Sequence, residues 1–231
     1  NFVVGDIQVS GGSLTSFTAS GGSTTVYTAT FTATADGATT IDVAAGGFSD
    51  AVGNTNSAAT QFTWTQDDTG PTMTITAAEV ADGGTSNDAA LSLTFTSNEA
   101  TSNFVVGDIQ VSNCGLSNFQ SNGGSTTVYT ATCTATADGA TTIDVAVNGF
   151  TDASGNQNSA ATQFNWLQDD TAPTMVITAS QVSDGDTSND AALSLTFTSN
   201  EATTTFAVGD IQVSGGSLSS FNGGSSTVYT A

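Results

Sequence analysis

The strongest constraint on this chain is a tandem repeat of 102 residues. The run NFVVGDIQVS begins at Asn1 and again at Asn103, and TFAVGDIQVS begins at Thr205. When residues 1–102 are aligned without gaps on residues 103–204, 79 positions are identical. The third copy reaches Ala231 within a run typical of a strand, so we expect the sequence to be a window on a longer tandem array.

Two prolines indicate where one domain ends and the next begins. Pro71 and Pro173 each follow an Asp-Asp-Thr run and one small residue, which is typical of a short linker. We therefore expect a partial domain at 1–69 that lacks its first strands, a complete domain at 70–170, and a partial domain at 171–231 that lacks its last strands. About 100 residues is an ordinary size for an independent domain.

The complete domain at 70–170, called the complete or second copy below, alternates apolar and polar residues with a period of two. This period favours β-strands over helices. Its strand candidates are MTIT, LSLTFT, VVGDIQV, TTVYTATCTATA, TTIDVAV and TQFNWLQ. They are rich in Thr, Val, Ile and Phe and are separated by Gly, Asn, Asp and Ser, as strands commonly are. Six or seven short strands in about 100 residues, with no helical stretch, predict an all-β fold of the β-sandwich type.

The alternation also predicts which side chains form the core, because successive residues of a strand point to opposite faces. In YTATFTATA, the aromatic and alanine side chains share one face and the threonines share the other. Two further strands give an apolar face in the same way. The expected core positions of the first copy are Tyr27, Ala29, Phe31, Ala33, Ile41, Val43, Phe62 and Trp64.

Two local irregularities carry information about the chain path. In FVVGDIQV, Phe2 and Val4 have one parity and Ile7 and Val9 the other, so a bulge or bend at Gly5 and Asp6 must absorb one residue. A two-residue turn at Asp36-Gly37 would bring Asp42 opposite Phe31 on the core face. We therefore expect a longer loop there, or a crossing from one sheet to the other.

The charge of the chain restricts its partners. It contains 21 acidic residues and no Lys, Arg or His, which gives a formal net charge of −21. Nucleic acid and anionic membrane surfaces are recognised through Lys and Arg, so both are poor partners. No stretch approaches the roughly 18 apolar residues of a membrane span. Cations are the natural partners, and an apolar content of 37% is enough to build a core.

The ordered set of motifs resembles the bacterial immunoglobulin-like (Big-type) tandem repeat domains of large secreted adhesins. The runs that carry the resemblance are DDTAPTMVIT, LSLTFTSNEAT, FVVGDIQVS, VYTATCTATADG and IDVAVNGFTDASGNQN, and they cover nearly all of the chain. The resemblance implies tandem immunoglobulin-like Greek-key β-sandwiches, with a period of 102 residues, in an extracellular stalk or adhesin.

Both cysteines of the chain lie in the second copy. Cys114 and Cys133 stand where the first copy has Gly12 and Phe31, so one copy has both cysteines and the other has neither. A paired gain predicts a disulfide within one domain, which suits an oxidising, extracellular compartment. The alternative is a metal-binding or reactive thiol pair, but no His or third Cys supports it.

The acids are expected to gather at the ends of the sandwiches. The first junction should collect Asp36, Asp67, Asp68 and Glu99, with Asp152 as a further candidate. The second junction should collect Asp138, Asp169, Asp170 and Glu201, joined by the loop from Asp82 to Asp88.

Oxygen ligands without nitrogen or sulfur suit a hard cation, and Ca²⁺ best, because it accepts six to eight oxygens in flexible geometry. We therefore expect Ca²⁺ at the junctions, where it would neutralise the paired linker acids and stiffen the linker. The alternative is that the aspartates only cap turns and keep the protein soluble. The chain contains no contiguous EF-hand signature.

The sequence favours a non-catalytic structural repeat of an extracellular stalk, filament or adhesin at the cell surface. Its partners would be neighbouring copies of the repeat, with lateral self-assembly into a fibre as an extension. A ligand-binding adhesin module is the alternative: rows of threonine could face ice, whereas a glycan needs an exposed aromatic platform and Trp64 and Trp166 match the core face. An enzyme is disfavoured because the chain offers no Ser-His-Asp set, phosphate-binding Lys or zinc ligand cluster.

Overall fold

The computed structural model describes residues 1–101 and 103–231, and it divides into two compact units, Asn1–Gln168 and Asp169–Ala231. The described residues form β-strands joined by loops and by single 3₁₀ turns, without any α-helix. The first unit contains the first copy and the complete second copy, and the second unit contains the third. None of the described helical turns is long or apolar enough to cross a membrane.

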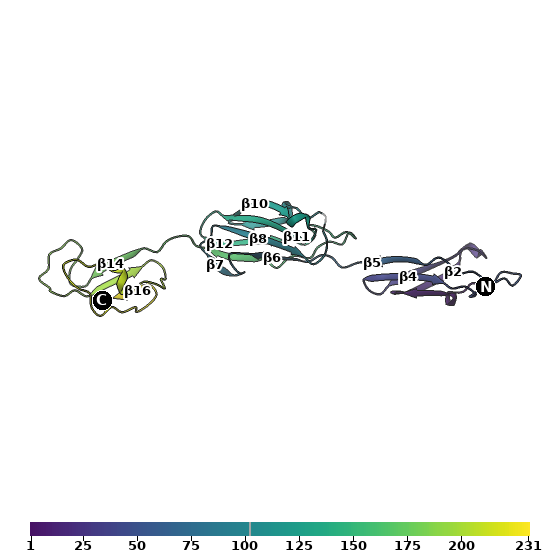
Figure 1. Cartoon of the computed structure of the whole chain (residues 1–231), viewed down its shortest axis with the longest axis horizontal. Helices are drawn as coiled ribbons and strands as arrows, with labels where there is room; N and C mark the ends of the chain where they lie inside the picture. Colours follow the sequence, from purple (N-terminus) through teal and green to yellow (C-terminus); the bar gives the residue numbers. More distant parts are fainter. Residues whose placement is uncertain (102) are drawn as a thin grey trace. The chain divides into compact units, whose positions relative to one another are not determined.

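The complete copy is a sandwich of two four-stranded sheets (Figure 1). The first sheet has the strand order β10-β11-β8-β6, and the second has the order β7-β13-β12-β9. In chain order the strands are β6 (Met73–Ala77), β7 (Gly84–Ser86), β8 (Ala90–Ser97), β9 (Ile109–Ser112), β10 (Cys114–Ser121), β11 (Val128–Ala135), β12 (Gly139–Val145) and β13 (Phe164–Gln168).

The connections make this sandwich a Greek key. β11 pairs antiparallel with β8, which lies well before it in the chain, and the chain then enters β12 of the other sheet. The first copy has the same crossing: β3 (Tyr27–Ala33) pairs with β2 (Gly12–Ala19), whereas β4 (Gly37–Val43) pairs with β1 (Ile7–Ser10) and β5 (Phe62–Gln66). The expectation of a crossing after Phe31 is therefore confirmed.

The core of the complete copy lies between the two sheets and contains the side chains that the alternation predicts. Tyr129, Ala131 and Cys133 of β11 are buried, and the threonines between them point away from the core. The counterparts Ile143, Val145, Phe164 and Trp166 are buried too, whereas Ala135, the counterpart of Ala33, is only half-buried. They pack in one cluster with Leu91, Leu93 and Phe95 of β8.

Three elements differ from the sequence-based expectation. Strands β7 and β10 were not among the candidates, and the predicted strand VVGDIQV is only four residues long because a 3₁₀ turn, Val106–Asp108, precedes β9. That turn absorbs the parity change, so there is no bulge within a strand. Its geometry is fixed by the carboxylate of Asp108, which accepts a hydrogen bond of 2.8 Å from the backbone N–H of Val105.

The first and third copies have fewer strands and less complete cores. The first copy has the sheets β1-β4-β5 and β2-β3. The second unit has one sheet, in the order β14 (Met175–Ala179), β15 (Leu195–Ser199) and β16 (Val228–Thr230). Because each lacks strands that the complete copy possesses, apolar side chains such as Phe62 and Ile177 are exposed.

Candidate functional site

In the linker that follows β5, the adjacent residues Asp67 and Asp68 have different hydrogen-bond partners. The backbone N–H of Asp68 donates a hydrogen bond of 2.7 Å to one carboxylate oxygen of Asp36, and the hydroxyl of Thr69 donates to the other. Asp36 lies in the loop between β3 and β4, so these contacts fasten the linker to the first copy.

These contacts set the ionisation of the two carboxyls in opposite directions. The hydrogen bonds from the Thr69 hydroxyl and the Asp68 amide lower the pKa of Asp36 below its usual value. The pKa of Asp68 is raised, because its side chain shares a hydrogen bond with Asp36 and is repelled by that charge, with smaller contributions from burial and from Asp67. The fold therefore favours a charged Asp36 and disfavours a charged Asp68.

Asp67 turns instead toward the complete copy. The hydroxyl of Ser154 donates a hydrogen bond of 2.7 Å to its carboxylate, and the side-chain amide of Asn156 donates one of 3.1 Å to its backbone oxygen. Further along, the N–H of Ser159 donates to the backbone oxygen of Pro71 at 3.0 Å. The linker is thus hydrogen-bonded to both copies that it joins.

The linker also fits closely against this loop at Gly70. A Cβ atom built at Gly70 would overlap the backbone oxygen of Gln157. Backbone atoms cannot move aside as easily as the end of a flexible side chain, so glycine is required for this approach.

The loop that receives Asp67 is held in shape by its own residues. The carboxylate of Asp152 accepts hydrogen bonds from the backbone of Gly155 at 2.7 Å and of Asn156 at 2.8 Å, and from the Asn156 side chain at 2.9 Å. In the first copy, Asp50 accepts equivalent bonds from Asn54. The run Asp-Ala-x-Gly-Asn therefore forms the loop by itself.

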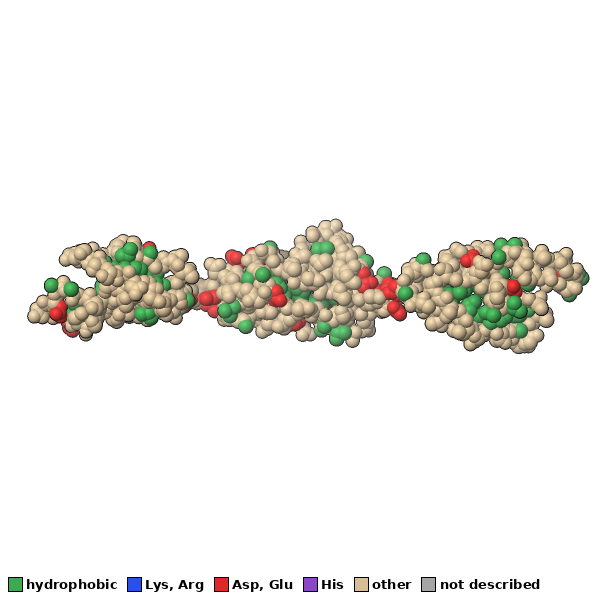
Figure 2. Space-filling model, turned by 90° about the horizontal axis from the view of Figure 1, so that it is seen from below, with side chains coloured by type: hydrophobic (Ala, Val, Ile, Leu, Met, Phe, Trp, Pro, Cys, Tyr) green, Lys and Arg blue, Asp and Glu red, His purple; other side chains and the backbone are tan. Residues whose placement is uncertain are grey.

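Asp67, Glu99 and Asp152 form the one group of possible metal ligands found among residues 1–101 and 103–231. One carboxylate oxygen of each lies within 4.8 Å of the others, with Asp152 buried and the other two half-buried. Figure 2 shows acidic side chains gathered on the narrow stretch of chain between β5 and β6, with no basic side chain on that face.

Burial and charge act on this group in different ways. Burial raises the pKa of Glu99, and the carboxylates of Asp152 and Asp67 raise it further. Burial also raises the pKa of Asp152, but the hydrogen bonds from Asn156 and Gly155 outweigh that effect and leave it below its usual value. The group therefore holds a concentrated negative charge that no basic side chain of the protein can balance.

The family model of the bacterial Ig-like domain matches three consecutive segments, residues 1–65, 67–167 and 169–231. The chain belongs to this family. The three matched segments follow the three copies of the repeat, and the two-sheet sandwich of the complete copy is the immunoglobulin-like fold. No curated protein and no solved structure matches the chain.

The predicted acids of the second junction lie in both compact units. Asp138 belongs to the first unit of this Ig-like chain, whereas Asp169, Asp170 and Glu201 belong to the second. One side-chain oxygen of Glu201 is buried without a hydrogen-bond partner. A shared site for these four residues stays a prediction.

The loop from Asp82 to Asp88 corrects one expectation about position. The carboxylate of Asp82 accepts hydrogen bonds from the backbone N–H of Asn165 at 2.8 Å and from its side chain at 3.0 Å. Asp82 therefore lies along β13 and not at the end of the Ig-like sandwich. The reason is that β7, which follows Asp82 directly, pairs in parallel with β13. Asp88 follows Ser86, which pairs with Gln168 at the last position of β13.

The predicted disulfide is confirmed. Cys114 of β10 and Cys133 of β11 are bonded, with their Cα atoms 5.8 Å apart. The bond joins the edge strand of its sheet to the neighbouring strand. In the first Ig-like copy the Phe31 ring lies over Gly12, where a Cβ atom would overlap it. The Gly12–Phe31 pair of the first copy therefore fills the same space as the Cys114–Cys133 pair of the complete copy.

Sequence reasoning missed Ser154 and Asn156 as partners of the linker. The available signal was the repeated run Asp-Ala-x-Gly-Asn at 50–54 and 152–156, which is typical of a turn closed by its own aspartate. The sequence placed this Ig-like loop at the same junction as the linker through Asp152, but it could not reveal which side chains of the loop bind Asp67.

Proposed function

We propose that the chain is a non-catalytic structural spacer of an extracellular stalk, filament or adhesin, in which each linker is fastened to the copies on both sides of it. The observation that carries the proposal is the linker itself. Asp68 and Thr69 are hydrogen-bonded to Asp36 of the first copy, and Asp67 is hydrogen-bonded to Ser154 and Asn156 of the second.

A spacer needs this kind of linker because each free backbone rotation between domains would make the array flexible. Fixing the backbone of one residue costs about 1–2 kcal/mol of conformational entropy, so ordered linkers require compensating contacts. Here the compensation comes from hydrogen bonds to the carboxylates of Asp36 and Asp67, which are stronger than hydrogen bonds between neutral groups. The contacts of the linker favour ordered spacing over a flexible tether.

Calcium is the second part of the proposal. Three carboxylates that converge within 4.8 Å repel one another, and a divalent cation would turn that repulsion into attraction. The donors fit Ca²⁺, since all are oxygens and the backbone oxygens of nearby turns and water can complete the shell. Asp67, Glu99 and Asp152 would hold the ion, and Ser154 would orient Asp67 by its hydrogen bond.

Thermal unfolding of the 231-residue chain with calcium and with chelator tests this proposal. Free calcium at about 100 times its dissociation constant should stabilise the complete copy by about 2.7 kcal/mol. Asp67→Asn should remove most of the difference between calcium and chelator. Asp184→Asn, which removes an exposed acid of the second unit, is the charge-matched control and should leave the difference unchanged. Equal melting temperatures with calcium and chelator would contradict the calcium site.

Bacterial Ig-like domains are typically non-catalytic modules and are commonly found outside the cell or on its surface, which supports the proposed place of this chain. The disulfide also suits an oxidising compartment. The glycan-binding alternative gains no support from Trp166, whose indole is buried in the core and is therefore no platform for a sugar.

A further inference from the structure

The complete copy has one strand edge that is open along its whole length. β6 is the edge strand of its sheet and pairs only with β8 among the described strands. The backbones of Thr72 and Ala78 are hydrogen-bonded on the β8 side. Because hydrogen bonding alternates along an antiparallel pair, the backbone N–H and C=O groups of Met73, Ile75 and Ala77 point the other way, toward the open edge.

The other three edges of this sandwich are protected in ways that β6 is not. β10 is interrupted by the register shift between Ser117 and Gln120. β9 has four residues and follows a 3₁₀ turn, and β7 has three residues. β6 has five residues in unbroken register, with neither a charge nor a proline among them. An edge of this kind is a ready template for another strand.

A slot of about 220 Å³ lies beside this edge, between the two sheets. Its floor is apolar and consists of the buried side chains of Met73 and Ile75 from β6 and Phe164 from β13. Its rim is polar and includes Thr74 and Asp82. Sites for small molecules usually measure about 300–1,000 Å³, so the size of this slot suits a single side chain.

Asp82 supplies a negative charge at the rim of the slot. Both hydrogen bonds that Asn165 donates to it end on the same carboxylate oxygen, Oδ1, at 2.8 and 3.0 Å. These bonds hold the carboxylate in place and leave its second oxygen available to a ligand. An apolar floor beside a carboxylate fits a Lys or Arg side chain, which has an apolar stem and a cationic head. None of the 231 residues is Lys or Arg, so another protein must supply it.

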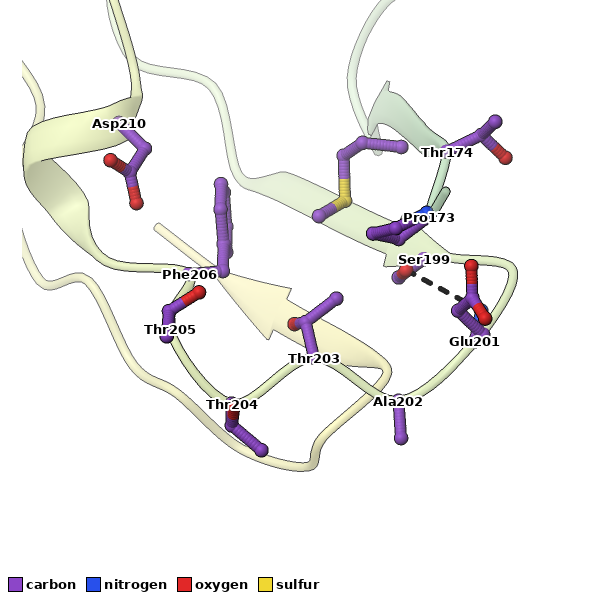
Figure 3. Close-up of a pocket in the computed structure, with 11 residues that line it drawn as sticks. Pro173, Thr174, Ser199, Glu201, Ala202, Thr203, Thr204, Thr205, Phe206 and Asp210 are labelled. Atoms are coloured by element: carbon purple, nitrogen blue, oxygen red, sulfur yellow. Dashed lines mark hydrogen bonds between the residues drawn. The ribbon is translucent and has the colours of Figure 1, made fainter. Parts of the chain in front are cut away.

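A larger pocket, of about 570 Å³, lies around Phe206 in the second unit (Figure 3). Most of its lining residues belong to the loops beside β14 and β15 rather than to a strand edge. In the complete copy the same place is filled, because Phe104, the counterpart of Phe206, packs against Phe150 with ring centroids 5.0 Å apart. The slot beside β6, in contrast, is present in the closed sandwich.

We propose that the open edge of β6 binds an extended segment of a basic partner protein, which adds a strand to the sheet and places one Lys or Arg side chain in the slot. A residue opposite Ile75 in the added strand shares the face of Ile75, so its side chain enters the space between the sheets. Main-chain hydrogen bonds to β6 supply affinity, and the side chain in the slot supplies specificity.

The charge of the chain favours this partner over a second copy of itself. With a net charge of −21, two copies repel each other, whereas a basic segment is attracted. The site goes beyond the spacer role and does not involve calcium, since Asp67, Glu99 and Asp152 are not among the residues that line the slot.

Titration of the ¹⁵N-labelled 231-residue chain with a synthetic peptide, in buffer that contains chelator, tests this inference. The probe is Thr-Val-Thr-Lys-Thr-Val-Thr with both ends blocked, so that its Lys and two Val side chains share one face. We expect shifts of the Met73, Ile75 and Ala77 amides and slower hydrogen exchange at these positions, because the peptide pairs with them. The affinity should fall as salt is added.

A pair of matched protein variants tests the role of the carboxylate. Asp82→Asn should weaken binding by about tenfold, since it removes the charge and keeps an oxygen that can accept from Asn165. Asp88→Asn, which removes an exposed charge beyond the end of β7, is the control and should bind like the parent chain. Equal affinities of the Asp82→Asn and Asp88→Asn variants would contradict the proposed place of the Lys side chain.

Two altered peptides separate strand pairing from simple charge attraction. A peptide with Glu in place of Lys should not bind, because it meets Asp82. A peptide with Pro in place of both Val residues keeps the charge but lacks two of the pairing N–H groups, so it should not protect the β6 amides. The absence of any shift in β6 with the Lys peptide, or equal binding of all three peptides, would overturn the proposal.

Discussion

Asp67 and Asp68 show how two adjacent like charges are accommodated without any basic residue in the chain. Their side chains diverge, with Asp68 directed to Asp36 and Asp67 to Ser154. Asp36 remains charged because the Thr69 hydroxyl and the Asp68 amide donate to it and lower its pKa. The charged form of Asp68 is disfavoured in the folded state, because contact with Asp36 raises its pKa on folding.

Asp68→Asn should therefore stabilise the protein at neutral pH in the presence of chelator. A group whose folded pKa is raised destabilises the fold while it is charged. An asparagine carries no charge and, unlike the ionised aspartate, can donate a side-chain hydrogen bond to Asp36. The gain should vanish at acid pH, where Asp68 is protonated in both states. Urea unfolding at the two pH values measures this, and a loss of stability at neutral pH would show that the Asp68 charge is used elsewhere.

At the same scale, equivalent phenylalanines should differ in their contribution to stability. Phe164→Ala should cost about 3–5 kcal/mol, because it opens a cavity in a closed core. Phe62→Ala, at the same position of the first copy, should cost much less because the side chain is already in water. Urea unfolding of each variant checks this, and equal costs would mean that the first copy is more closed than the structure indicates.

At the scale of strands, the disulfide and the Gly–Phe pair are alternative ways to hold the edge strand. Cys114 and Cys133 join β10 to β11 in the complete copy, and Phe31 covers Gly12 at the same place in the first. The two solutions exclude each other, because a Cβ atom at the glycine position would overlap the ring.

Reduction of the disulfide should lower the free energy of unfolding of the complete copy by about 3 kcal/mol on the chain-entropy model. The double variant Cys114→Gly with Cys133→Phe should recover part of that loss, whereas Cys133→Phe alone should be the least stable of the set. Urea unfolding of the parent chain, of the single variants Cys114→Gly and Cys133→Phe and of the double variant measures the coupling between the two sites. Additive effects of the two substitutions would contradict the exchange.

The sequence predicted strands well where alternation is regular and poorly where it is broken. β11 and β13 alternate without interruption, and their buried residues were correctly placed. β10 was not predicted, because its alternation is broken. Its pairing with β11 shifts register between Ser117 and Gln120, where Asn118 has a φ of 54°. β7 has three residues with no apolar pattern and depends on its pairing with β13.

The candidate site was predictable only in part for a related reason. The linker acids and Glu99 could be assigned to one end of a sandwich because strand direction fixes which loops share a pole. The partners of Asp67 could not, since hydrogen bonding to Ser154 depends on how the linker lies against a loop 87 residues further along the chain.

At the scale of the whole molecule, the linker determines whether the repeats form an ordered array. Its closeness to the second copy rests on Gly70, which lies against the backbone oxygen of Gln157. Ser159 and Asn156 then hold the backbone on either side of that point. A larger residue at position 70 would have to move the linker away from the loop.

Gly70→Ala should therefore destabilise the docked linker by about 1–3 kcal/mol, the usual cost of inserting an extra methyl group into a packed site. Gly107→Ala is the matched control, because a Cβ atom there meets nothing within 4 Å and the backbone is not left-handed. Thermal unfolding and amide exchange at Asp68 report the effect. A Gly70→Ala variant with unchanged protection at Asp68 would show that the linker is not held by this contact.

An ordered spacer requires that the linker between the first and second copies is held rigidly. Measurement of ¹⁵N relaxation at the Asp68 amide, in buffer that contains calcium, tests whether it is. If Asp36 and the loop at Asp152 hold the linker, the order parameter of this amide should be about 0.85, as in rigid backbone such as the strands. An order parameter below about 0.6 would mean a flexible tether, and it would contradict the proposal that this chain is an ordered spacer.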